Sequence, residues 1–245
     1  MPGALVYRTG NFREKLDVGY KKLGIFVKTP VPGEVKTRLT PPLTPAEACG
    51  LYRAFLADLF ARVLRLKKVS LTVFYAGSNA DALAGLVPPK IPVVPQEGSS
   101  LGERLENAFG SLFARDDAPA CVIGSDSPDL PLVYIKRTFI KLKHRDVVLG
   151  PSLGGGYYLV GLKRPVPEIL RGIAWGGSDV FRDTLLKVES QGLSLGLLPP
   201  WYDVDGMDPL SLLETMLIAT KIAGGDRLPR VEQALSEIRE KVRER

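Results

Sequence analysis

The residues best suited to chemistry in this 245-residue chain are two aspartates in the segment Val122-Ile-Gly-Ser-Asp-Ser-Pro-Asp-Leu-Pro131. The apolar run at 120–123 is typical of a buried strand, and the Ser-Pro dipeptide after Asp126 turns the chain at once. Asp126 and Asp129 are therefore expected where an open α/β sheet binds ligands, beyond the carboxyl ends of its strands. A carboxylate on a turn of small residues can approach a divalent cation and a phosphate together. The alternative is that one of them only caps the helix starting near Leu130, since Asp is a common N-cap.

A loop rich in cations follows the first predicted strand, at 23–28. It reads Lys28-Thr-Pro-Val-Pro-Gly-Glu-Val-Lys-Thr-Arg38, and Lys28, Lys36 and Arg38 give it three positive charges. Such a loop suits a di- or triphosphate, because Arg makes bidentate contacts with phosphate and Lys acts as a point charge. It is no Walker loop, since Gly-Lys-Ser/Thr is missing. A rigid surface loop with solvated charges is the other interpretation.

Two glycine-rich loops carry side chains that could contact a substrate. In the run Gly154-Gly-Gly-Tyr157, the glycines at 155 and 156 let a ligand approach the backbone closely. A glycine run can equally be an ordinary hairpin or bulge. In the segment Ile173-Ala-Trp-Gly-Gly-Ser178, the indole of Trp175 could stack on a ring or simply close the core. Tyr157 and Trp175 are therefore candidates for substrate binding.

A further loop contains three more carboxylates, at Asp203, Asp205 and Asp208. The first two follow an apolar strand, so the fold should return them to the sheet edge where Asp126 lies, and alternation puts both on one side of an extended segment. Mg²⁺ typically takes one or two protein carboxylates and completes its octahedron with water and substrate phosphates. Asp126 and one aspartate of this loop are thus expected to share a cation. Asp208 is expected to cap the helix that follows Pro209.

Composition excludes several other classes of function. The net charge is +6 and the pI about 9.3, but the cations are scattered, and no basic stretch is interleaved with aromatics, so we expect no nucleic-acid partner. With one histidine, His144, and two cysteines predicted to be buried thiols, zinc sites and histidine triads are disfavoured. No apolar run approaches the roughly 20 residues that span a bilayer, and the N-terminus lacks a signal-peptide pattern. We therefore expect a cytoplasmic chain with no membrane span.

Strands and helices alternate along the chain. Strands are predicted at 23–28, 69–75, 91–94, 120–123, 147–149, 156–162 and 193–197. Helices are predicted at 44–66, 99–113, from about 130, 178–189, 209–223 and 230–243, the first with a Thr44–Glu47 capping box. This alternation favours a mainly parallel sheet covered on both faces. With no internal repeat or linker, residues 1–245 are expected to form a single domain, with an N-terminal extension at 1–20 and a C-terminal helix at 226–245.

In combination the loops resemble a known family. The segments that carry the resemblance are Lys28-x-Pro-x-Pro-Gly-x-Val-Lys-Thr-Arg-Leu39, Leu101-Gly-Glu-Arg-Leu105, Gly124-Ser-Asp-Ser-Pro-Asp-Leu130, Gly150-Pro and Gly-Gly-Tyr157, Trp175-Gly and Asp203-Val-Asp205. In this order they resemble the radical-SAM/selenodomain-associated transferases, a bacterial and archaeal group of the nucleotide-diphospho-sugar transferase superfamily. The resemblance covers residues 23–223. It implies a GT-A-type fold, a three-layer α/β/α sandwich whose mostly parallel sheet is mixed, with at least one antiparallel strand after the Asp turn.

Residue by residue, the resemblance implies a site for a nucleotide and a cation. Asp126 matches the metal- and phosphate-binding Asp, and the family spacing favours Asp205 over Asp203 as the second metal contact. The expected catalytic residues are thus Asp126 and Asp205, with Mg²⁺ or Mn²⁺ as the cofactor. The expected nucleotide- and phosphate-binding residues are Lys28, Lys36, Arg38, Gly124, Ser125, Gly155 and Gly156. Related sequences usually carry an Asp where this chain has Gly154, so this chain has lost that carboxylate or uses a neighbour such as Asp179.

Two reactions fit these residues. The first is metal-dependent glycosyl transfer from a nucleotide-diphospho-sugar, in which the cation neutralises the developing diphosphate charge. The alternative is nucleotidylyl transfer from a nucleoside triphosphate, which the three clustered cations favour and the missing glycine-rich start disfavours. A non-catalytic nucleotide-binding protein is a third hypothesis, encouraged by Gly154. The sequence leaves the oligomeric state open, a homo-oligomer included.

Overall fold

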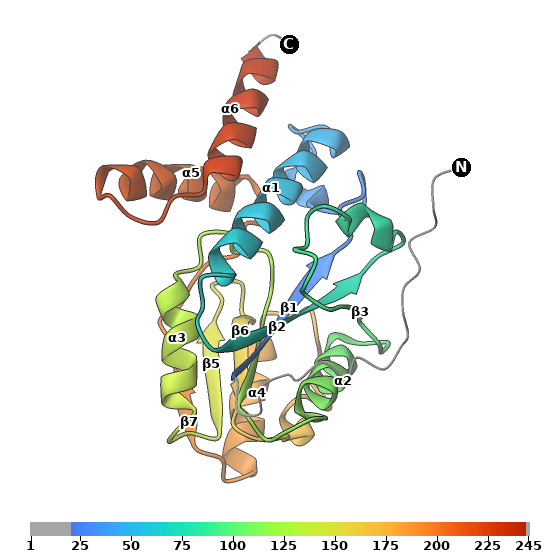
Figure 1. Ribbon diagram of the computed structural model, residues 1–245, viewed down its shortest axis with the longest axis vertical. Helices are drawn as coiled ribbons and strands as arrows, with labels where there is room; N and C mark the ends of the chain where they lie inside the picture. The colour runs from blue at the N-terminus through green and yellow to red at the C-terminus, as the bar shows by residue number, and fades with distance from the viewer. Residues whose placement is uncertain (1–20, 244–245) are drawn as a thin grey trace.

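A seven-stranded mixed sheet forms the middle of the molecule (Figure 1), with the strand order β3-β2-β1-β4-β6-β5-β7. The computed structural model describes residues 21–243, so the expected extension at 1–20 lies outside the described residues. The strands are β1 (Lys21–Lys28), β2 (Val69–Ala76), β3 (Val93–Pro95), β4 (Ala120–Ile123), β5 (Val147–Pro151), β6 (Tyr157–Leu162) and β7 (Leu195–Leu197).

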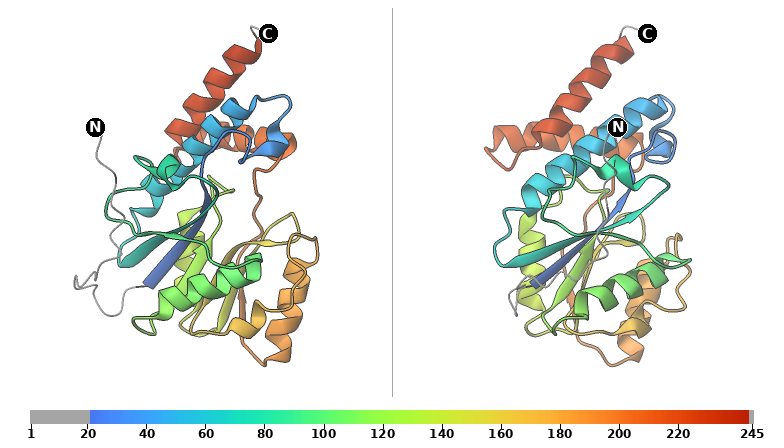
Figure 2. Two further views of the ribbon diagram at one scale, coloured as in Figure 1. Left: turned by 90° about the vertical axis from the view of Figure 1, so that its right-hand side faces the viewer. Right: turned by 45° about the vertical axis from the view of Figure 1, so that its right-hand side comes forward.

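Helices cover both faces of this sheet (Figure 2), which confirms the expected three-layer α/β/α sandwich. The helices of the described residues are α1 (Pro45–Val63), α2 (Leu101–Phe113), α3 (Leu132–Lys141), α4 (Val180–Ser190), α5 (Met207–Ile222) and α6 (Pro229–Arg243). One hydrophobic cluster packs α1 and α3 on one face and extends to α5 and α6. A second cluster packs α2 and α4 on the other face. Strand β4 is accordingly buried along its whole length, as the sequence predicted.

The strand that reverses direction is β6. It pairs antiparallel with both β4 and β5, whereas the other strands run parallel to one another. The short segment 152–156 joins β5 to β6, and a connection of that length can only form a hairpin, because parallel neighbours need a long crossover. The purely parallel sheet suggested by the alternation is therefore wrong, and the mixed sheet implied by the resemblance is confirmed. All strands except β6 end at one edge of the sheet, where β6 begins.

Local signals in the sequence fix the start of α1. The Thr44 hydroxyl accepts a hydrogen bond from the Glu47 amide at 3.2 Å, and the Glu47 carboxylate accepts one from the Thr44 amide at 2.8 Å. This capping box, with Pro45 at the first helical position, confirms the predicted helix start. The second turn of this helix reaches the edge where β1 and β4 end, because the Tyr52 hydroxyl contacts the Lys28 amide and Ser125.

The two C-terminal helices extend beyond the sandwich, at the top of Figure 1. Helix α6 corresponds to the expected C-terminal helix and packs on α1. Its N-terminus is anchored by Asp58 of α1, a carboxylate that is only 1% exposed. Asp58 accepts hydrogen bonds of 3.0 Å from the amides of Arg230 and Val231. An acceptor for these amides stabilises a helix start, because they have no partner inside the helix.

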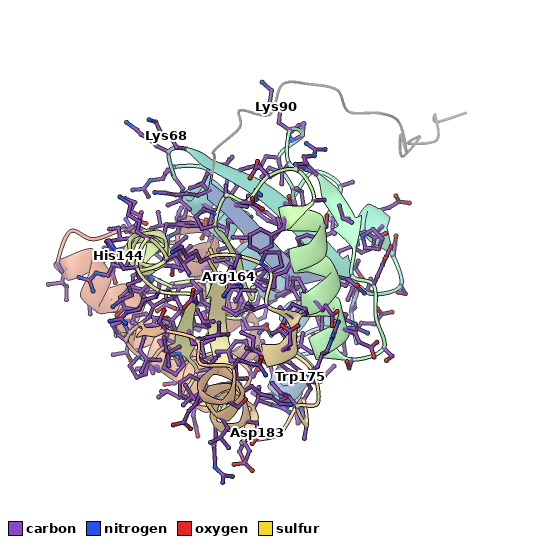
Figure 3. The ribbon with its side chains drawn as sticks, turned by 90° about the horizontal axis from the view of Figure 1, so that it is seen from below. Lys68, Lys90, His144, Arg164, Trp175 and Asp183 are labelled. Carbon is purple, nitrogen blue, oxygen red and sulfur yellow. The ribbon has the colours of Figure 1, made fainter. Side chains whose placement is uncertain are left out.

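The cysteines and the single histidine lie within the described residues 21–243. Cys49 and Cys121 are buried free thiols, as predicted. His144 is exposed after α3 and lies at the periphery of the molecule viewed from below (Figure 3). Within these residues no helix combines the length and apolar composition that a bilayer crossing requires.

Candidate functional site

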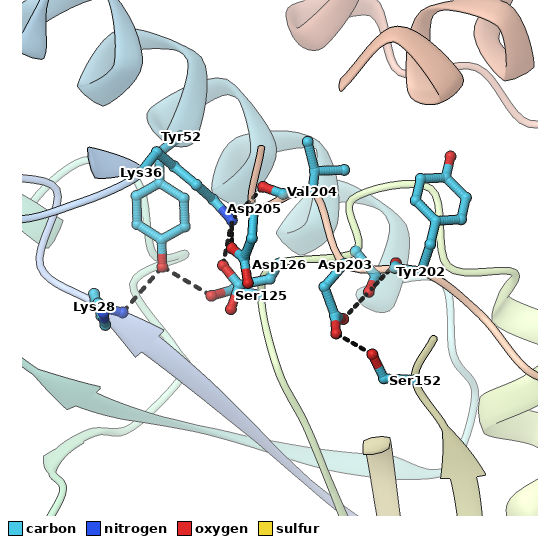
Figure 4. Close-up of polar contacts among 11 residues, drawn as sticks. Lys28, Lys36, Tyr52, Ser125, Asp126, Ser152, Tyr202, Asp203, Val204 and Asp205 are labelled. Atoms are coloured by element: carbon cyan, nitrogen blue, oxygen red, sulfur yellow. Dashed lines mark hydrogen bonds and ion pairs between the residues drawn. The ribbon is translucent and has the colours of Figure 1, made fainter. Parts of the chain in front are cut away.

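Two carboxylates far apart in the sequence meet at the edge where the strands end. Asp126 follows β4, and Asp205 lies in the loop before α5. The Val204 amide donates a 2.8 Å hydrogen bond to the backbone carbonyl of Asp126, which ties the two loops together. The Lys36 ammonium donates to Asp126 Oδ1 at 2.5 Å and to Asp205 Oδ1 at 3.1 Å (Figure 4). A single cation can therefore contact both carboxylates, as the sequence predicted for a metal.

Lys36 is held between these carboxylates by its backbone and by its burial. Its φ of 49° and ψ of 36° are left-handed, an uncommon conformation for a residue other than glycine. The side chain is only 3% exposed, and its ammonium lies 5.7 Å from the ring centres of Tyr52 and Phe55. Burial lowers the pKa of Lys36, but the carboxylates of Asp126 and Asp205 outweigh this, and the pKa is raised overall. Lys36 therefore keeps its charge.

The hydroxyls of Ser125 and Tyr52 hold the turn that carries Asp126, and both side chains are buried. Ser125 is 3% exposed, and its Oγ lies 2.8 Å from the hydroxyl of Tyr52 on α1. The Lys28 amide donates to the same tyrosine hydroxyl at 3.0 Å (Figure 4). Burial, together with the charge of Asp126, raises the pKa of Tyr52, so its hydroxyl stays neutral. Tyr52 was not among the residues predicted for the site, because no local pattern marks its contact with Ser125.

The remaining aspartates of the two loops serve the scaffold. Asp203 accepts hydrogen bonds from Ser127 at 2.9 Å and from Ser152, and burial raises the pKa of Asp203. Asp129 accepts from the Trp201 indole at 3.2 Å and from the Tyr202 hydroxyl at 2.5 Å. These contacts join the Asp turn to the loop before α5. They leave Asp126 and Asp205, each about half exposed, as the carboxylates open to a ligand.

The helix-capping alternatives do not hold. The N-cap of α3 is Pro131, and no side chain caps that helix, so neither Asp126 nor Asp129 is its cap. The expectation for Asp208 is also wrong. Helix α5 begins at Met207 with Gly206 as its N-cap, which places Asp208 inside the first turn. A carboxylate there still favours the helix through the macrodipole, without a capping hydrogen bond.

Two cations are exposed, Lys28 at the end of β1 and Arg38 in the short 3-10 helix Thr37–Leu39. Lys28 and Arg38 both face solvent. Within residues 21–243, no hydrogen bond or ion pair of either side chain is found. Gly124 is exposed too, and a Cβ added there would meet no atom within 4 Å. The segments that follow β1 and β4 thus contribute two exposed positive charges and an exposed glycine backbone, which suit a phosphate chain.

The glycine run is the hairpin between β5 and β6, and its members have different surroundings. Gly155 has a φ of 87°, and a Cβ there would lie 2.2 Å from the Ser178 carbonyl oxygen. Its own carbonyl accepts a 2.9 Å hydrogen bond from Phe181, so Gly155 packs against the start of α4. Gly156 has open space around it, and Gly154 meets only Ser152 Oγ at 3.7 Å. Of the two glycines of this run that were expected to bind phosphate, Gly156 has room for a ligand at its α-carbon and Gly155 does not.

The two aromatic candidates pack against each other. The rings of Tyr157 and Trp175 lie 6.1 Å apart at 82°, an edge-to-face contact. Trp175 also covers Gly102 at the start of α2, where a Cβ would lie 2.4 Å from the indole nitrogen. Tyr157 is largely enclosed, and burial raises its pKa. Trp175 is half-buried, so part of its indole surface is open to a ligand. Tyr157 packs against the indole ring and holds it in place.

The chemistry of the donor set fits a hard cation. Within residues 21–243, no group of three His, Cys, Asp or Glu side chains is placed to hold a metal ion. The pair of Asp126 and Asp205 is joined by the Val204 carbonyl oxygen, which lies 2.9 Å from the Lys36 ammonium. Mg²⁺ and similar cations bind through one or two carboxylates together with waters and substrate phosphates. The residues present therefore fit a metal that arrives with a phosphate ligand.

Comparisons with known proteins agree with this arrangement. The sandwich has the fold of the nucleotide-diphospho-sugar transferases, and the similar proteins are transferases. A candidate nucleotide-diphospho-sugar transferase from Desulfovibrio desulfuricans G20 is 32% identical, with a TM-score of 0.77, over 90% of this chain and 97% of that one. The chain belongs to the same transferase family as that protein. In addition, the model of a family of uncharacterised proteins conserved in bacteria (DUF2064) matches residues 59–177.

A more distant relative is a guanylyltransferase. The chain is 26% identical over 168 residues to the 2-phospho-L-lactate guanylyltransferase of Methanothermobacter thermautotrophicus, covering 68% of this chain and 71% of that one. A 4-diphosphocytidyl-2C-methyl-D-erythritol synthase from Anaerococcus prevotii shares the fold, with a TM-score of 0.57 at 8% identity over 81% of this chain and 96% of that one. The narrower resemblance to the radical-SAM/selenodomain-associated group stays a prediction.

Proposed function

We propose that the chain is a metal-dependent nucleotidylyltransferase, which transfers a nucleoside monophosphate from a nucleoside triphosphate to a small phosphorylated acceptor. An acceptor oxygen attacks the α-phosphorus, the bond between the α-phosphorus and its bridging oxygen breaks, and pyrophosphate leaves. The observation that carries the proposal is the convergence of Asp126 and Asp205 on one cation position, the ammonium of Lys36. Lys28 and Arg38 on the same segment of chain are exposed. The similarity to a guanylyltransferase supports this reaction over glycosyl transfer.

Each of the candidate site residues has a role in this proposal. Asp126, Asp205 and the Val204 carbonyl would hold Mg²⁺ or Mn²⁺, and the cation would supply positive charge to offset that of the pyrophosphate. Lys28 and Arg38, the exposed cations at and after the end of β1, bind the phosphate chain and position it for attack. The remaining proposed contacts are the backbone of Gly124, Ser125 and Gly156, and the surface of Trp175 for the substrate.

Glycosyl transfer from a nucleotide-diphospho-sugar is the second candidate. It is favoured by the Desulfovibrio relative, which is a candidate nucleotide-diphospho-sugar transferase. The same carboxylates and cations would hold a nucleoside diphosphate, because both donors present a metal-bound diphosphate. The two reactions differ in the bond that breaks and hence in the product released.

Product analysis separates the two reactions. The protein should be incubated with Mn²⁺, each common nucleoside triphosphate and a panel of phosphorylated acceptors, while pyrophosphate release is followed. Parallel reactions should contain nucleotide sugars, with release of free nucleoside diphosphate as the readout. We expect pyrophosphate release that requires both metal and acceptor. Release of nucleoside diphosphate from a nucleotide sugar, without pyrophosphate release in the first series, would establish the second candidate instead.

A further inference from the structure

The Lys36 ammonium lies among three oxygens that have the character of metal ligands. Asp126 Oδ1, Asp205 Oδ1 and the Val204 carbonyl lie 2.5, 3.1 and 2.9 Å from its nitrogen. Carboxylate and carbonyl oxygens are the donors that hard divalent cations take. A lysine ammonium is a compact point charge, so it fills this position as a cation does. These oxygens therefore cannot hold a metal ion and the Lys36 ammonium at the same time.

We infer that Lys36 is an internal cation that holds the metal position and leaves it only when a metal and a phosphate chain arrive together. The inference rests on the metal-dependent transfer proposed above and assigns Lys36 a regulatory role in the same site. Metal binding must break two ion pairs of Lys36, so the metal alone binds weakly. The released ammonium needs a new counter-charge, because an unpaired buried charge is costly.

The incoming phosphates supply that counter-charge. Lys36 lies between two exposed cations of the same segment, Lys28 at the end of β1 and Arg38 two residues after Lys36. Its left-handed backbone directs the side chain at the carboxylates, and Gly33 in the same loop also has a positive φ of 85° with open space around it. Once displaced, Lys36 is near the position proposed for the phosphate chain. The metal and the triphosphate are thereby coupled, each favouring the binding of the other.

The test measures the affinity for Mn²⁺ with and without a non-hydrolysable nucleoside triphosphate, using the paramagnetic resonance signal of free Mn²⁺. Lys36→Met removes the charge and keeps an unbranched side chain. Without nucleotide, we expect Lys36→Met to bind Mn²⁺ about tenfold more tightly than the unmodified protein. With nucleotide, we expect the gain in Mn²⁺ affinity to be at least about fivefold smaller in Lys36→Met, within the usual range of coupling factors.

Lys90→Met is the matched control. It removes an exposed lysine that lies before β3, outside the loop of Lys36. Its Mn²⁺ affinity, with and without nucleotide, should equal that of the unmodified protein. Thermal unfolding verifies that each variant is folded. If Lys36→Met does not fold, Lys36→Gln replaces it, since a neutral amide can still donate a hydrogen bond to a carboxylate.

The outcomes distinguish this inference from the proposed function. Equal or weaker Mn²⁺ binding by the folded Lys36 variant, with normal metal-dependent nucleotide binding in the unmodified protein, overturns the internal cation and leaves the proposed function standing. Nucleotide binding without any Mn²⁺ binding, in both proteins, overturns both. Tighter Mn²⁺ binding together with reduced coupling supports the inference.

Discussion

Replacing Asp126 with Asn is expected to lower kcat/KM for metal-dependent transfer by about 10²- to 10³-fold, a loss typical of removing one strong electrostatic stabiliser. Asn keeps the size of the side chain and removes the charge that the cation needs. The metal affinity measured in the presence of nucleotide should fall as well. Thermal unfolding should change little, because Asp126 is about half exposed.

Asp129→Asn is the matched control for this prediction. Asp129 lies on the same turn, but its carboxylate accepts hydrogen bonds from Trp201 and Tyr202, away from the cation position. An amide oxygen can accept one of these bonds, so this variant should keep metal-dependent binding while losing some stability. Comparable losses of activity in the folded Asp126 and Asp129 variants would show that the turn as a whole, and not the Asp126 charge, carries the effect.

The largest expected effect on stability comes from Arg62→Met. Arg62 is 6% exposed and donates to the carbonyl oxygens of Pro128 at 2.6 Å and Leu130 at 3.0 Å. It also pairs with Asp226, before α6, at 3.0 Å. Truncation leaves these acceptors without their donor, and we expect the free energy of unfolding to fall by about 3 kcal/mol. Urea unfolding followed by circular dichroism measures this loss.

Arg65→Met provides the comparison. Arg65 pairs with the same Asp226, but its side chain is 60% exposed and has no hydrogen bond to the Asp turn. An exposed ion pair contributes little, so this variant should lose less than about 1 kcal/mol. Similar destabilisation by the two substitutions would mean that Arg62 stabilises the protein through its ion pair with Asp226, and not through its hydrogen bonds to Pro128 and Leu130.

Sequence patterns predicted the framework because they are local. The buried strand at 120–123 and the capping box at Thr44 depend on neighbouring residues only, and both are confirmed. The meeting of Asp126 and Asp205 was also predictable, because strand ends in a sheet of this kind gather at one edge. The antiparallel β6 was implied by the resemblance and not by the alternation of strands and helices.

The features that were missed depend on tertiary contacts. Lys36 was predicted to face a phosphate, whereas its ammonium contacts the carboxylates of Asp126 and Asp205. The links of Tyr52 to Ser125, and of Arg62 to the Asp turn, join positions distant in sequence. The cap predicted at Asp208 failed because α5 begins earlier, with Gly206 as its N-cap.

Crystals grown with Mn²⁺ and a non-hydrolysable nucleoside triphosphate test the central claim most directly, through the anomalous signal of manganese. We expect a manganese peak in contact with the carboxylates of both Asp126 and Asp205, at about the 2.1 Å typical of such small cations. The triphosphate should lie against Lys28 and Arg38, with the Lys36 ammonium moved from the carboxylates to a phosphate oxygen. A bound nucleotide with its phosphates elsewhere, and no manganese at Asp126 and Asp205, would contradict the account.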